Sequence, residues 1–590
     1  MCGIVGYLGK RKSVWDIVET LKKLEYRGYD SAGIALLENE EIISIKSVGN
    51  IKQLQDKISK NICATSMIAH TRWATHGLVC EENAHPHASS GNLWAVVHNG
   101  IIENYEELKR YLKTKPQSQT DTSVVAQMLE ESGAKDMSEF IDVFKNVSGS
   151  FAIVAQCKYK PDALFIAKHK SPLFIAQNQD RDVLIASDPI FFAGFAKEYY
   201  QFFDHEFAEV NCEKIVFFDK DKNQIKKTQT PIDSNFETAN KCGFEHFMLK
   251  EIEEESSAIN RQVEFFKNNN ILAVFNKDFI SRFDRIMFIG CGTAYHAGLA
   301  GAKFISKQTK IYSTAEVASE LLYDTPQFIN EKTLCIFVSQ SGETADTCGA
   351  AVLAKSKGAM CVALTNVTYS SLARIADIVV PVCAGPEIAV ASTKAYVCQL
   401  SAIYMLACHL KNELENSEIK YFEIIKNIAN KILYFNREQI DQLAQKIILK
   451  NDVIFIGKGL DFVTATESAL KLKEVSYINS TSYPSGELKH GFLALVENGT
   501  FVIAIAGDKF SKIKTINSAN EARARGALIV IVSNEKIKEA DDVIFVDEQD
   551  DLLFAIRSIV PMQYLAYKVS VLKEINPDQP RNLAKSVTVE

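Results

Sequence analysis

Cys2 is the residue whose type and place in the chain offer the most chemistry. Removal of Met1 would leave a thiol and a free α-amine on this one residue. An α-amine with a pKa near ~8 can take the thiol proton at neutral pH, so the residue could be both nucleophile and base. Most cysteines at position 2 are incidental, so this interpretation needs support from other motifs.

A turn rich in hydroxyl groups could hold a phosphate. Ser339, Ser341 and Thr344 follow a β-type run and precede a helical one. Exposed N–H groups and the helix dipole favour an anion at such a turn, whereas a simple serine cap needs one hydroxyl rather than three. Thr293, on a neighbouring glycine turn, would add a donor. The chain has no GxxxxGK[ST] motif and no sound GxGxxG, so nucleotide binding is disfavoured.

A third group of residues could move protons. Glu467, Lys471 and Glu474 fall on one helical face by their spacing. A solvated stripe of charges is the commoner explanation of such a pattern, but His490 lies in a polar loop nearby. A carboxylate and a histidine that titrates near neutrality are what ketose–aldose isomerisation needs.

Residues of the N-terminal part could hold an amino acid. Arg72 offers a planar fork for a carboxylate. Asn99 and Gly100, after a predicted strand at 93–97, could donate an amide N–H and a backbone N–H to an oxyanion. Asp121 opens a predicted helix, where it could hold an ammonium or, equally well, be a plain N-cap.

The elements that position these residues change in kind along the chain. Up to residue 219, short β-type runs are interrupted by predicted helices at 103–112 and 122–131, which indicates an α+β layered domain. Residues 220–239 are polar and indicate a linker. From there strand, glycine turn and helix alternate, with strands at 285–289 and 333–338, as in a parallel doubly wound sheet.

This strand–turn–helix unit occurs twice. The second copy has Asp508 where the first has Ser341, and an aspartate there would repel a phosphate. We therefore expect one copy to bind the anion and the other to serve a different part of the site. The landmarks that recur at an offset of 167 or 168 positions are Gly290 with Gly457, Ser339 with Ala506, Gly358 with Gly526, and Asn366 with Asn534.

The composition is that of an ordinary soluble globular protein, with 47% hydrophobic and 24% charged residues. A length of 590 residues suggests roughly three to five domains, and the net charge of -7 argues against a nucleic-acid binder. Thirteen scattered cysteines without a CxxC pair indicate a reducing compartment. The His85-Pro86-His87 run is interpreted as loop surface and not as a metal site. No metal or cofactor is therefore expected.

The chain is expected to be cytoplasmic and to make no membrane contact. Its N-terminus lacks the layout of a signal peptide. The longest apolar stretch, residues 395–410, is too short to span a bilayer and predicts a buried core helix instead.

Taken together, the motifs resemble those of the glutamine–fructose-6-phosphate aminotransferase (isomerising) family, the glucosamine-6-phosphate synthases. The resemblance covers essentially the whole chain, and eight ordered motifs in two unlike domains make it very specific. They are CGIVG at 2–6, RGYDS at 27–31, HTRWATHG at 70–77, HNG at 98–100, SQSGET at 339–344, ASTK at 391–394, GELKHG at 486–491 and the final TVE.

The resemblance implies an α+β N-terminal-nucleophile glutaminase sandwich (αββα) followed by two α/β doubly wound SIS (sugar isomerase) domains. It also implies glutamine-dependent conversion of fructose 6-phosphate to glucosamine 6-phosphate and glutamate, the first step of amino-sugar synthesis, in a homodimer. The expected domains are the glutaminase at 1–219, a linker at 220–245, SIS domains at 246–430 and 431–575, and a C-terminal tail at the sugar site, 576–590.

By the same resemblance, Cys2 would attack the glutamine amide, with Asn99 and Gly100 as the oxyanion hole. Ammonia would pass to the sugar through an internal channel with Trp73 as its gate. The residues that would hold glutamine are Arg72, Thr75, His76 and Asp121.

At the sugar, Glu474 would move the proton between C1 and C2. His490 would assist ring opening and could reach the partner's site in the dimer. Lys471 and Lys585 would serve imine chemistry or charge stabilisation. The residues at the sugar phosphate would be Thr293, Ser339, Gln340, Ser341 and Thr344.

Three positions depart from the family pattern, although none removes a group assigned to the chemistry. Ala294 stands where the family usually has a serine that touches the phosphate, and the loss of that hydrogen bond would cost about 1 kcal/mol. Phe492 replaces a common proline. Residues 254–256, Glu-Glu-Ser, replace the usual Glu-Gln-Pro.

Three other functions fit the sequence less well. An amidophosphoribosyltransferase would share Cys2 but needs an acidic-pair phosphoribosyl loop, which is not found. A non-catalytic sugar-phosphate sensor built from SIS repeats would not need Cys2, Arg72 and Asn99 in register. A glutaminase whose sugar domain had decayed would have lost residues such as Glu474.

Overall fold

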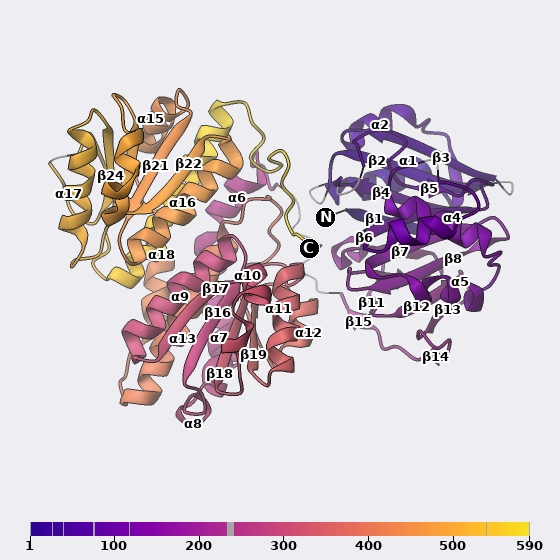
Figure 1. The fold of residues 1–590 in the computed structure, drawn as a ribbon, viewed down its shortest axis with the longest axis horizontal. Coiled ribbons are helices and arrows are strands. Elements are labelled where there is room, and N and C mark those ends of the chain that lie inside the picture. Colours follow the sequence, from indigo (N-terminus) through magenta and orange to yellow (C-terminus); the bar gives the residue numbers. More distant parts are fainter. Residues whose placement is uncertain are drawn as a thin grey trace. The chain divides into compact units, whose positions relative to one another are not determined.

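The computed structural model describes residues 2–25, 28–38, 41–74, 77–116, 118–232, 241–538 and 540–588. The chain divides into two compact units, Met1–Ala239 with Ala584–Glu590, and Asn240–Leu583. Figure 1 shows the first unit mainly in indigo and purple and the second from magenta to yellow.

Within the described residues, the first unit is built on two antiparallel sheets (Figure 1). From edge to edge, one contains β15 (Thr230–Pro231), β11 (Glu198–Gln201), β9 (Phe174–Gln177), β10 (Val183–Ala186), β1 (Gly3–Ser13), β4 (Cys63–Arg72), β2 (Ser31–Glu38) and β3 (Glu41–Val48). The other contains β14 (Gln224–Ile225), β13 (Ile215–Phe218), β12 (Glu206–Val210), β8 (Lys160–His169), β7 (Gly149–Cys157), β6 (Trp94–Ile102) and β5 (His87–Ala88).

The two sheets pack face to face, and helices cover their outer faces. Successive residues of a strand point to opposite sides of its sheet. Ile4 accordingly belongs to the core cluster that both sheets share, whereas Val5 belongs to the cluster beneath the helices. The layers are therefore αββα, which confirms the predicted sandwich. The covering helices are α1 (Val14–Lys22) and α2 (Ile51–Lys57) on one side, and α3 (Tyr105–Tyr111), α4 (Asp121–Glu131) and α5 (Met137–Val143) on the other.

Part of the segment predicted as a linker belongs to the sheets of the first unit. Within residues 220–245, β14 and β15 are each the edge strand of one sheet, and β15 pairs with β11, for example through Thr230 with Tyr199. An edge strand is as exposed and as polar as a linker, so composition could not separate the two. The helix predicted at 103–112 is shorter than expected and begins at Tyr105.

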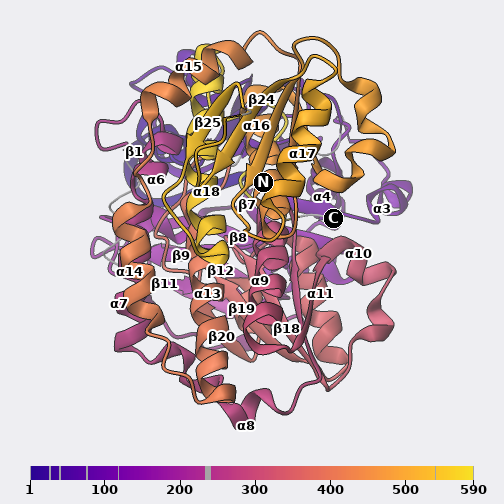
Figure 2. The ribbon, with the colours of Figure 1, turned by 90° about the vertical axis from the view of Figure 1, so that its left-hand side faces the viewer.

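Within the described residues, the second unit contains two parallel sheets with the same strand order (Figure 2). The first contains β17 (Tyr312–Val317), β16 (Arg285–Gly290), β18 (Thr333–Ser339), β19 (Met360–Thr365) and β20 (Ile378–Pro381). The second contains β22 (Asn479–Pro484), β21 (Asp452–Gly457), β23 (Phe501–Ala506), β24 (Leu528–Ser533) and β25 (Asp542–Phe545).

Helices cover both faces of each of these sheets, which confirms the doubly wound prediction. One large core cluster joins the two sheets through α9, α13, α16 and α18, and a smaller cluster lies on the other face of each sheet. The helices are α6 (Phe247–Glu253), α7 (Glu255–Asn268), α8 (Lys277–Ile280), α9 (Thr293–Thr309), α10 (Ala318–Tyr323), α11 (Ala345–Ser356), α12 (Ser371–Ile375), α13 (Lys394–Glu415), α14 (Tyr421–Lys431), α15 (Arg437–Ile447), α16 (Leu460–Ser476), α17 (Lys512–Arg523) and α18 (Asp551–Leu572).

The internal repeat extends to single residues. α9 and α16 begin and end 167 positions apart, and so do α11 and α17. The strand register repeats as well, because Ile286 pairs with Leu334 in the first sheet and Val453 with Phe501 in the second. A residue of one repeat can therefore be compared with its counterpart in the other.

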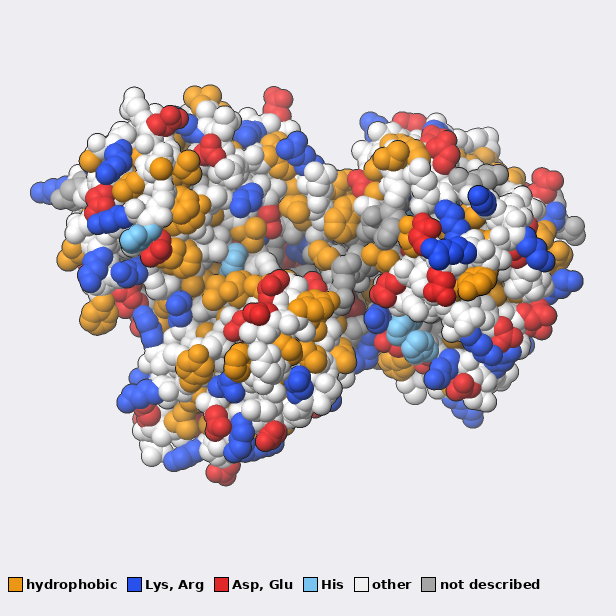
Figure 3. Space-filling model, in the orientation of Figure 1, with side chains coloured by type: hydrophobic (Ala, Val, Ile, Leu, Met, Phe, Trp, Pro, Cys, Tyr) orange, Lys and Arg blue, Asp and Glu red, His pale blue; other side chains and the backbone are white. Residues whose placement is uncertain are grey.

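The apolar run at 395–410 lies in α13 and is almost wholly buried, as predicted. No helix within the described residues is long and apolar enough to cross a membrane. On the face drawn in Figure 3, acidic and basic side chains are intermixed over each unit.

Glu255 begins α7 with its carboxyl group fully buried. Burial raises its pKa well above the usual 4.5, and the carboxylate of Glu387 raises it further. A side-chain hydrogen bond from Gln563 acts to lower this pKa, but burial outweighs it. A glutamine at the same position would carry no charge at any pH and so avoids the cost of a buried carboxylate.

We predict that Glu255→Gln stabilises the second unit. Because the folded pKa is raised, wild-type folding takes up a proton, and stability falls as the pH rises above the usual value of 4.5. The amide avoids this loss, so the free energy of unfolding should rise by about 1–3 kcal/mol. Thermal unfolding should show a larger gain at about pH 8 than at about pH 6. The control is Glu264→Gln, an exposed change on the same helix, and equal effects of the two variants would contradict the prediction.

Candidate functional site

Cys2 lies immediately before β1, half-buried, and neighbouring strands hold it from two sides. Its Sγ accepts the backbone N–H of Trp73 at 3.3 Å and lies 3.6 Å from the Trp73 carbonyl oxygen. From the other sheet, Asn99 Nδ2 donates to the Cys2 carbonyl oxygen at 2.8 Å. The thiol is therefore fixed in position before any substrate binds.

The thiol needs a base in order to react. Burial raises the pKa of Cys2, although the N–H group of Trp73 and the charge of Arg72 act to lower it. A thiol with a raised pKa is mostly protonated at neutral pH, and only the thiolate is a good nucleophile. The residue thus depends on a nearby proton acceptor, as the α-amine hypothesis requires.

The amide of Asn99 has a defined orientation. His70 Nε2 lies 2.9 Å from the His98 carbonyl oxygen and 3.1 Å from Asn99 Oδ1. Both neighbours are acceptors, so this ring nitrogen must carry the hydrogen. The amide oxygen of Asn99 is thereby held toward His70, and its NH₂ group is turned toward Cys2.

Gly100 follows Asn99 on β6 and can only be glycine. Its φ is 133°, and a Cβ at this position would lie 2.0 Å from the Ser150 carbonyl oxygen. The close approach of the two strands leaves no space for a side chain. Asn99 and Gly100 are therefore adjacent donors on a rigid strand.

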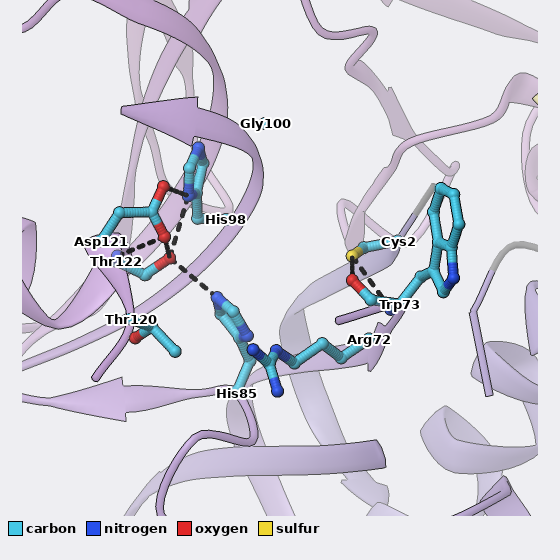
Figure 4. A pocket seen from close by; sticks show the side chains of 9 residues that line it. All are labelled: Cys2, Arg72, Trp73, His85, His98, Gly100, Thr120, Asp121 and Thr122. Atoms are coloured by element: carbon cyan, nitrogen blue, oxygen red, sulfur yellow. Dashed lines mark hydrogen bonds and ion pairs between the residues drawn. The ribbon is translucent and has the colours of Figure 1, made fainter. Parts of the chain in front are cut away.

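Cys2 opens onto a pocket of the first unit (Figure 4). Two residues predicted to hold glutamine, Arg72 and Asp121, line this pocket together with Gly100 and Trp73. The lining residues that were not predicted are His85, His98, Thr120 and Thr122.

The histidines around this pocket form a buried network. His85 and His98 each lie 2.9 Å from the Thr122 hydroxyl, and the rings of His70 and His85 stack with centres 4.1 Å apart. Burial lowers the pKa of His70 to about 3 and that of His85 well below its usual value. The rings of His70 and His85 therefore stay neutral and shape the pocket rather than act as acids or bases. No group of His, Cys, Asp and Glu among the described residues could hold a metal ion.

Arg72 and Asp121 bring opposite charges to the pocket. Arg72 ends β4 and is 3% exposed. Asp121 accepts the backbone N–H groups of Ile102 and Thr122, each at 2.9 Å. The N-cap of α4 is Thr120, so the capping alternative considered for Asp121 does not apply.

Asp30 is a site residue that the sequence analysis missed. Its carboxylate accepts the N–H of Ala74 at 2.8 Å, and its own N–H donates to the Arg72 carbonyl oxygen at 3.0 Å. It therefore shapes the segment that carries Arg72 and Trp73. The RGYDS motif marked its position but not this role.

Other predictions for the first unit have different outcomes. Thr75 and His76, predicted to hold glutamine, lie outside the described residues. The run 85–87 is buried and not loop surface as interpreted, because His85 contacts Thr122 inside the pocket wall. Alternation of polar and apolar residues did not indicate this burial.

In the second unit, the predicted phosphate turn joins β18 to α11. The N–H of Gly342 donates to Ser339 Oγ at 2.9 Å, and that of Glu343 donates to Ser341 Oγ at 3.1 Å. Gly342 has a φ of 66°, and a Cβ there would lie 2.0 Å from a neighbouring hydroxyl oxygen. Thr344 occupies the N-cap without a side-chain capping bond. The serine oxygens accept backbone N–H groups within the turn, which holds both side chains next to the start of α11.

The stripe on α16 is buried, so it is not a solvated face. Lys471 Nζ lies 2.7 Å from Glu474 Oε2 and 3.4 Å from Glu467 Oε1, and it donates to Thr293 Oγ1 at 2.9 Å. Thr293 donates to Glu467 at 3.0 Å, and His296 Nδ1 lies 2.7 Å from the second oxygen of that carboxylate. Thr293 and His296 belong to α9, so this cluster joins the two repeats.

The cluster keeps its charges despite burial. Burial alone would lower the pKa of Lys471, but the carboxylates of Glu474 and Glu467 outweigh it and raise the pKa. Burial would likewise raise the pKa of Glu467, but Lys471, His296 and Thr293 lower it. Glu474 has 20% of its side chain exposed, so it is the carboxylate of this cluster that a ligand can reach.

Two further residues were predicted to act at the sugar. His490 ends a short 3-10 helix, Ser485–His490, and is exposed. Lys585 belongs to the segment Ala584–Glu590, which groups with the first unit. Their roles at the sugar remain predictions.

Two protein-family models match the chain. The one described as a glutamine amidotransferase domain matches residues 70–193, in the first unit. The one described as an SIS domain matches residues 279–409 and 446–573, which contain the two parallel sheets.

Known proteins match the chain from end to end. A glutamine–fructose-6-phosphate aminotransferase [isomerizing] of Caldanaerobacter subterraneus subsp. tengcongensis is 42% identical over 610 residues, with 100% of each chain covered. A protein of the same name from Thermococcus kodakarensis is 40% identical over 608 residues, again with 100% of each covered. Among solved structures, the C-terminal domain of glucosamine-fructose-6-phosphate aminotransferase from Francisella tularensis is 33% identical, with a TM-score of 0.53. The match covers 58% of this chain and 100% of that one.

We predict that Glu467→Gln destabilises the second unit. The change removes one of the two carboxylates that compensate the buried charge of Lys471. The expected loss is about 3 kcal/mol, the low end for a broken buried pair, because Glu474 remains. Calorimetry should show a smaller loss for Glu474→Gln, whose side chain is more exposed. Equal unfolding temperatures for Glu467→Gln and the wild type would contradict the prediction.

Proposed function

The chain belongs to the glutamine–fructose-6-phosphate aminotransferase (isomerizing) family, and on this premise we propose how its parts divide the reaction. It is an enzyme that uses glutamine to convert fructose 6-phosphate to glucosamine 6-phosphate, with glutamate as the other product. The observation that carries the proposal is a cysteine pocket in one unit together with a hydroxyl-rich turn in the other.

In the first unit, Cys2 acts once Met1 is removed. Its α-amine takes the thiol proton, and the thiolate attacks the amide carbon of glutamine. Asn99 donates one N–H to the Cys2 carbonyl oxygen, so its second N–H is left for the oxyanion, next to the N–H of Gly100. The intermediate then expels ammonia, which takes its proton from the α-amine, and water hydrolyses the remaining thioester to glutamate.

The charges of the pocket suit the amino-acid end of glutamine. The guanidinium of Arg72 matches the planar carboxylate, and Asp121 matches the ammonium group. Asp121 accepts the N–H of Ile102 and both the N–H and the hydroxyl of Thr122, and a carboxylate has about four acceptor positions, so capacity remains for the substrate. Thr75 and His76 complete the set by family resemblance.

In the second unit, the phosphate of the sugar binds the turn between β18 and α11. Its oxygens accept hydrogen bonds from hydroxyl groups and from the N-terminus of α11, a helix of 12 residues. The residues assigned to the phosphate are Thr293, Ser339, Gln340, Ser341 and Thr344.

Glu474 moves the proton between C1 and C2 of the sugar after ammonia has condensed with the ketone and water has left. The internal repeat supports its place beside the phosphate turn. Lys307, its counterpart 167 positions earlier, lies 3.3 Å from Asp508 in the matching turn of the other repeat. Lys471, held beside Glu474, stabilises developing negative charge.

Family resemblance alone supports the remaining assignments. Lys585 serves the imine, and His490 assists ring opening. The exposure of His490 is compatible with a role at the partner's site in a homodimer. Ammonia passes between the sites through an internal channel with Trp73 as its gate.

We place the protein in the cytoplasm. All thirteen cysteines are free thiols, and five of them are buried within the cores. Free thiols in such number are typical of a reducing compartment.

We predict that Cys2→Ala abolishes glucosamine 6-phosphate formation from glutamine but not from ammonium. The variant lacks the nucleophile that releases ammonia, while the sugar site is unchanged. Mass spectrometry of glutamate and glucosamine 6-phosphate with each nitrogen source measures both halves. Cys212→Ala, a half-buried cysteine of the same unit, is the control and should retain both activities. Glutamine-dependent activity in Cys2→Ala would refute the assignment. Failure of the wild type to aminate the sugar with either source would leave a glutaminase beside a sugar-phosphate sensor.

A further inference from the structure

The second repeat contains a turn at the position that corresponds to the phosphate turn. This second turn, residues 506–511, joins β23 to α17 as the phosphate turn joins β18 to α11. The N–H of Phe510 donates to Asp508 Oδ1 at 2.9 Å, just as the N–H of Glu343 donates to Ser341 Oγ at 3.1 Å. The two turns therefore match in an internal hydrogen bond as well as in position.

The carboxylate of Asp461 is seated on this second turn. Its Oδ2 accepts the backbone N–H of Gly507 at 2.9 Å and that of Asp508 at 3.0 Å. Asp461 lies in the first turn of α16 and is 1% exposed. Its counterpart in α9, 167 positions earlier, is Ala294. Where one repeat directs a carboxylate at the turn, the other presents a methyl group.

We propose that the second turn is an anion-binding site filled from within, with the carboxylate of Asp461 in the place that the sugar phosphate takes in the first repeat. The inference rests on the proposed binding of the phosphate at residues 339–344. By this correspondence, the phosphate lies over the methyl group of Ala294. Ala294 then leaves room for the phosphate. The replacement of the family's serine by alanine therefore does more than remove one hydrogen bond. Each chain therefore binds one sugar phosphate.

The surroundings of the second turn enclose the carboxylate of Asp461. The ring of Phe554 packs so closely on Gly507 that a Cβ there would lie 2.1 Å from it. Lys307 pairs with Asp508 at 3.3 Å and so compensates the carboxylate on the turn that faces Asp461. Burial raises the pKa of Asp461 to about 7, and the charges of Asp508 and Asp551 act in the same direction, whereas the N–H groups of Asp508 and Gly507 lower it. A carboxylate is costly to bury, so its presence indicates that these backbone donors need an acceptor.

The first test removes the internal anion and supplies another. Asp461→Ala leaves two buried N–H groups without this acceptor and should lower the unfolding temperature. At about pH 8, sodium formate should raise that temperature by about 2–4 °C more in Asp461→Ala than in the wild type, because an anion that binds only the folded state stabilises it. Sodium chloride at equal ionic strength controls for screening. Asp461→Asn keeps an acceptor on the turn and should not respond to formate. Equal responses of Asp461→Ala and Asp461→Asn would overturn the proposal.

The second test places the same carboxylate in the first repeat. Ala294→Asp should fill the phosphate turn and abolish amination of fructose 6-phosphate, while glutamine hydrolysis at Cys2 continues. Ala294→Ser adds a hydroxyl without a charge and should still form amino sugar. Full sugar activity in a folded Ala294→Asp variant would overturn the correspondence between the turns. Suppose that formate stabilises Asp461→Ala but that Ala294→Asp leaves sugar activity unchanged. The first result would support an anion site at the second turn, and the second would refute the proposed phosphate site at residues 339–344.

Discussion

Backbone N–H groups at the carboxyl end of a buried parallel strand must find an acceptor, and the second unit depends on how each repeat meets this requirement. In the first repeat the turn after β18 is polar, and its serine oxygens bind the N–H groups of Gly342 and Glu343. In the second repeat the turn after β23 is closed by Asp461. One fold, used twice, thus yields one turn at which we propose that the substrate binds and one internal contact that holds α16 against its sheet.

That contact bears on the chemistry because α16 also carries Glu467, Lys471 and Glu474. The buried ammonium group of Lys471 is compensated by two carboxylates of its own helix and by a hydroxyl of α9. These bonds fix the angle between the helices, so the more exposed carboxylate of Glu474 stays in one place relative to the phosphate turn. The first unit uses a similar device, because the neutral ring of His70 orients the amide of Asn99 toward Cys2. In both units, buried polar groups position a more accessible residue to which we assign the chemistry.

Local sequence patterns predicted the features of the fold that depend on residues close together in the sequence. Strand alternation, glycine turns and the offset of 167 positions predicted the layers, the doubly wound sheets and the repeat. These patterns could not predict which side chains, distant in the sequence, contact one another in the fold. The helical spacing of Glu467 and Lys471 predicted a common face but not its burial, which α9 provides. A motif marked the position of Asp30, but its bonds to the segment at 72–74 are long-range and were not predicted. Asp461 likewise gave no signal, because its partners lie 46 and 47 residues away.

The central claim is that nitrogen freed at Cys2 reaches the sugar without mixing with ammonia in solution. The most direct measurement supplies glutamine labelled with ¹⁵N in its amide, together with excess unlabelled ammonium and fructose 6-phosphate, and determines the isotope in the amino sugar. The account predicts glucosamine 6-phosphate that is mostly ¹⁵N-labelled and equal in amount to the glutamate formed. Unlabelled amino sugar, or glutamate without amino sugar, would contradict it.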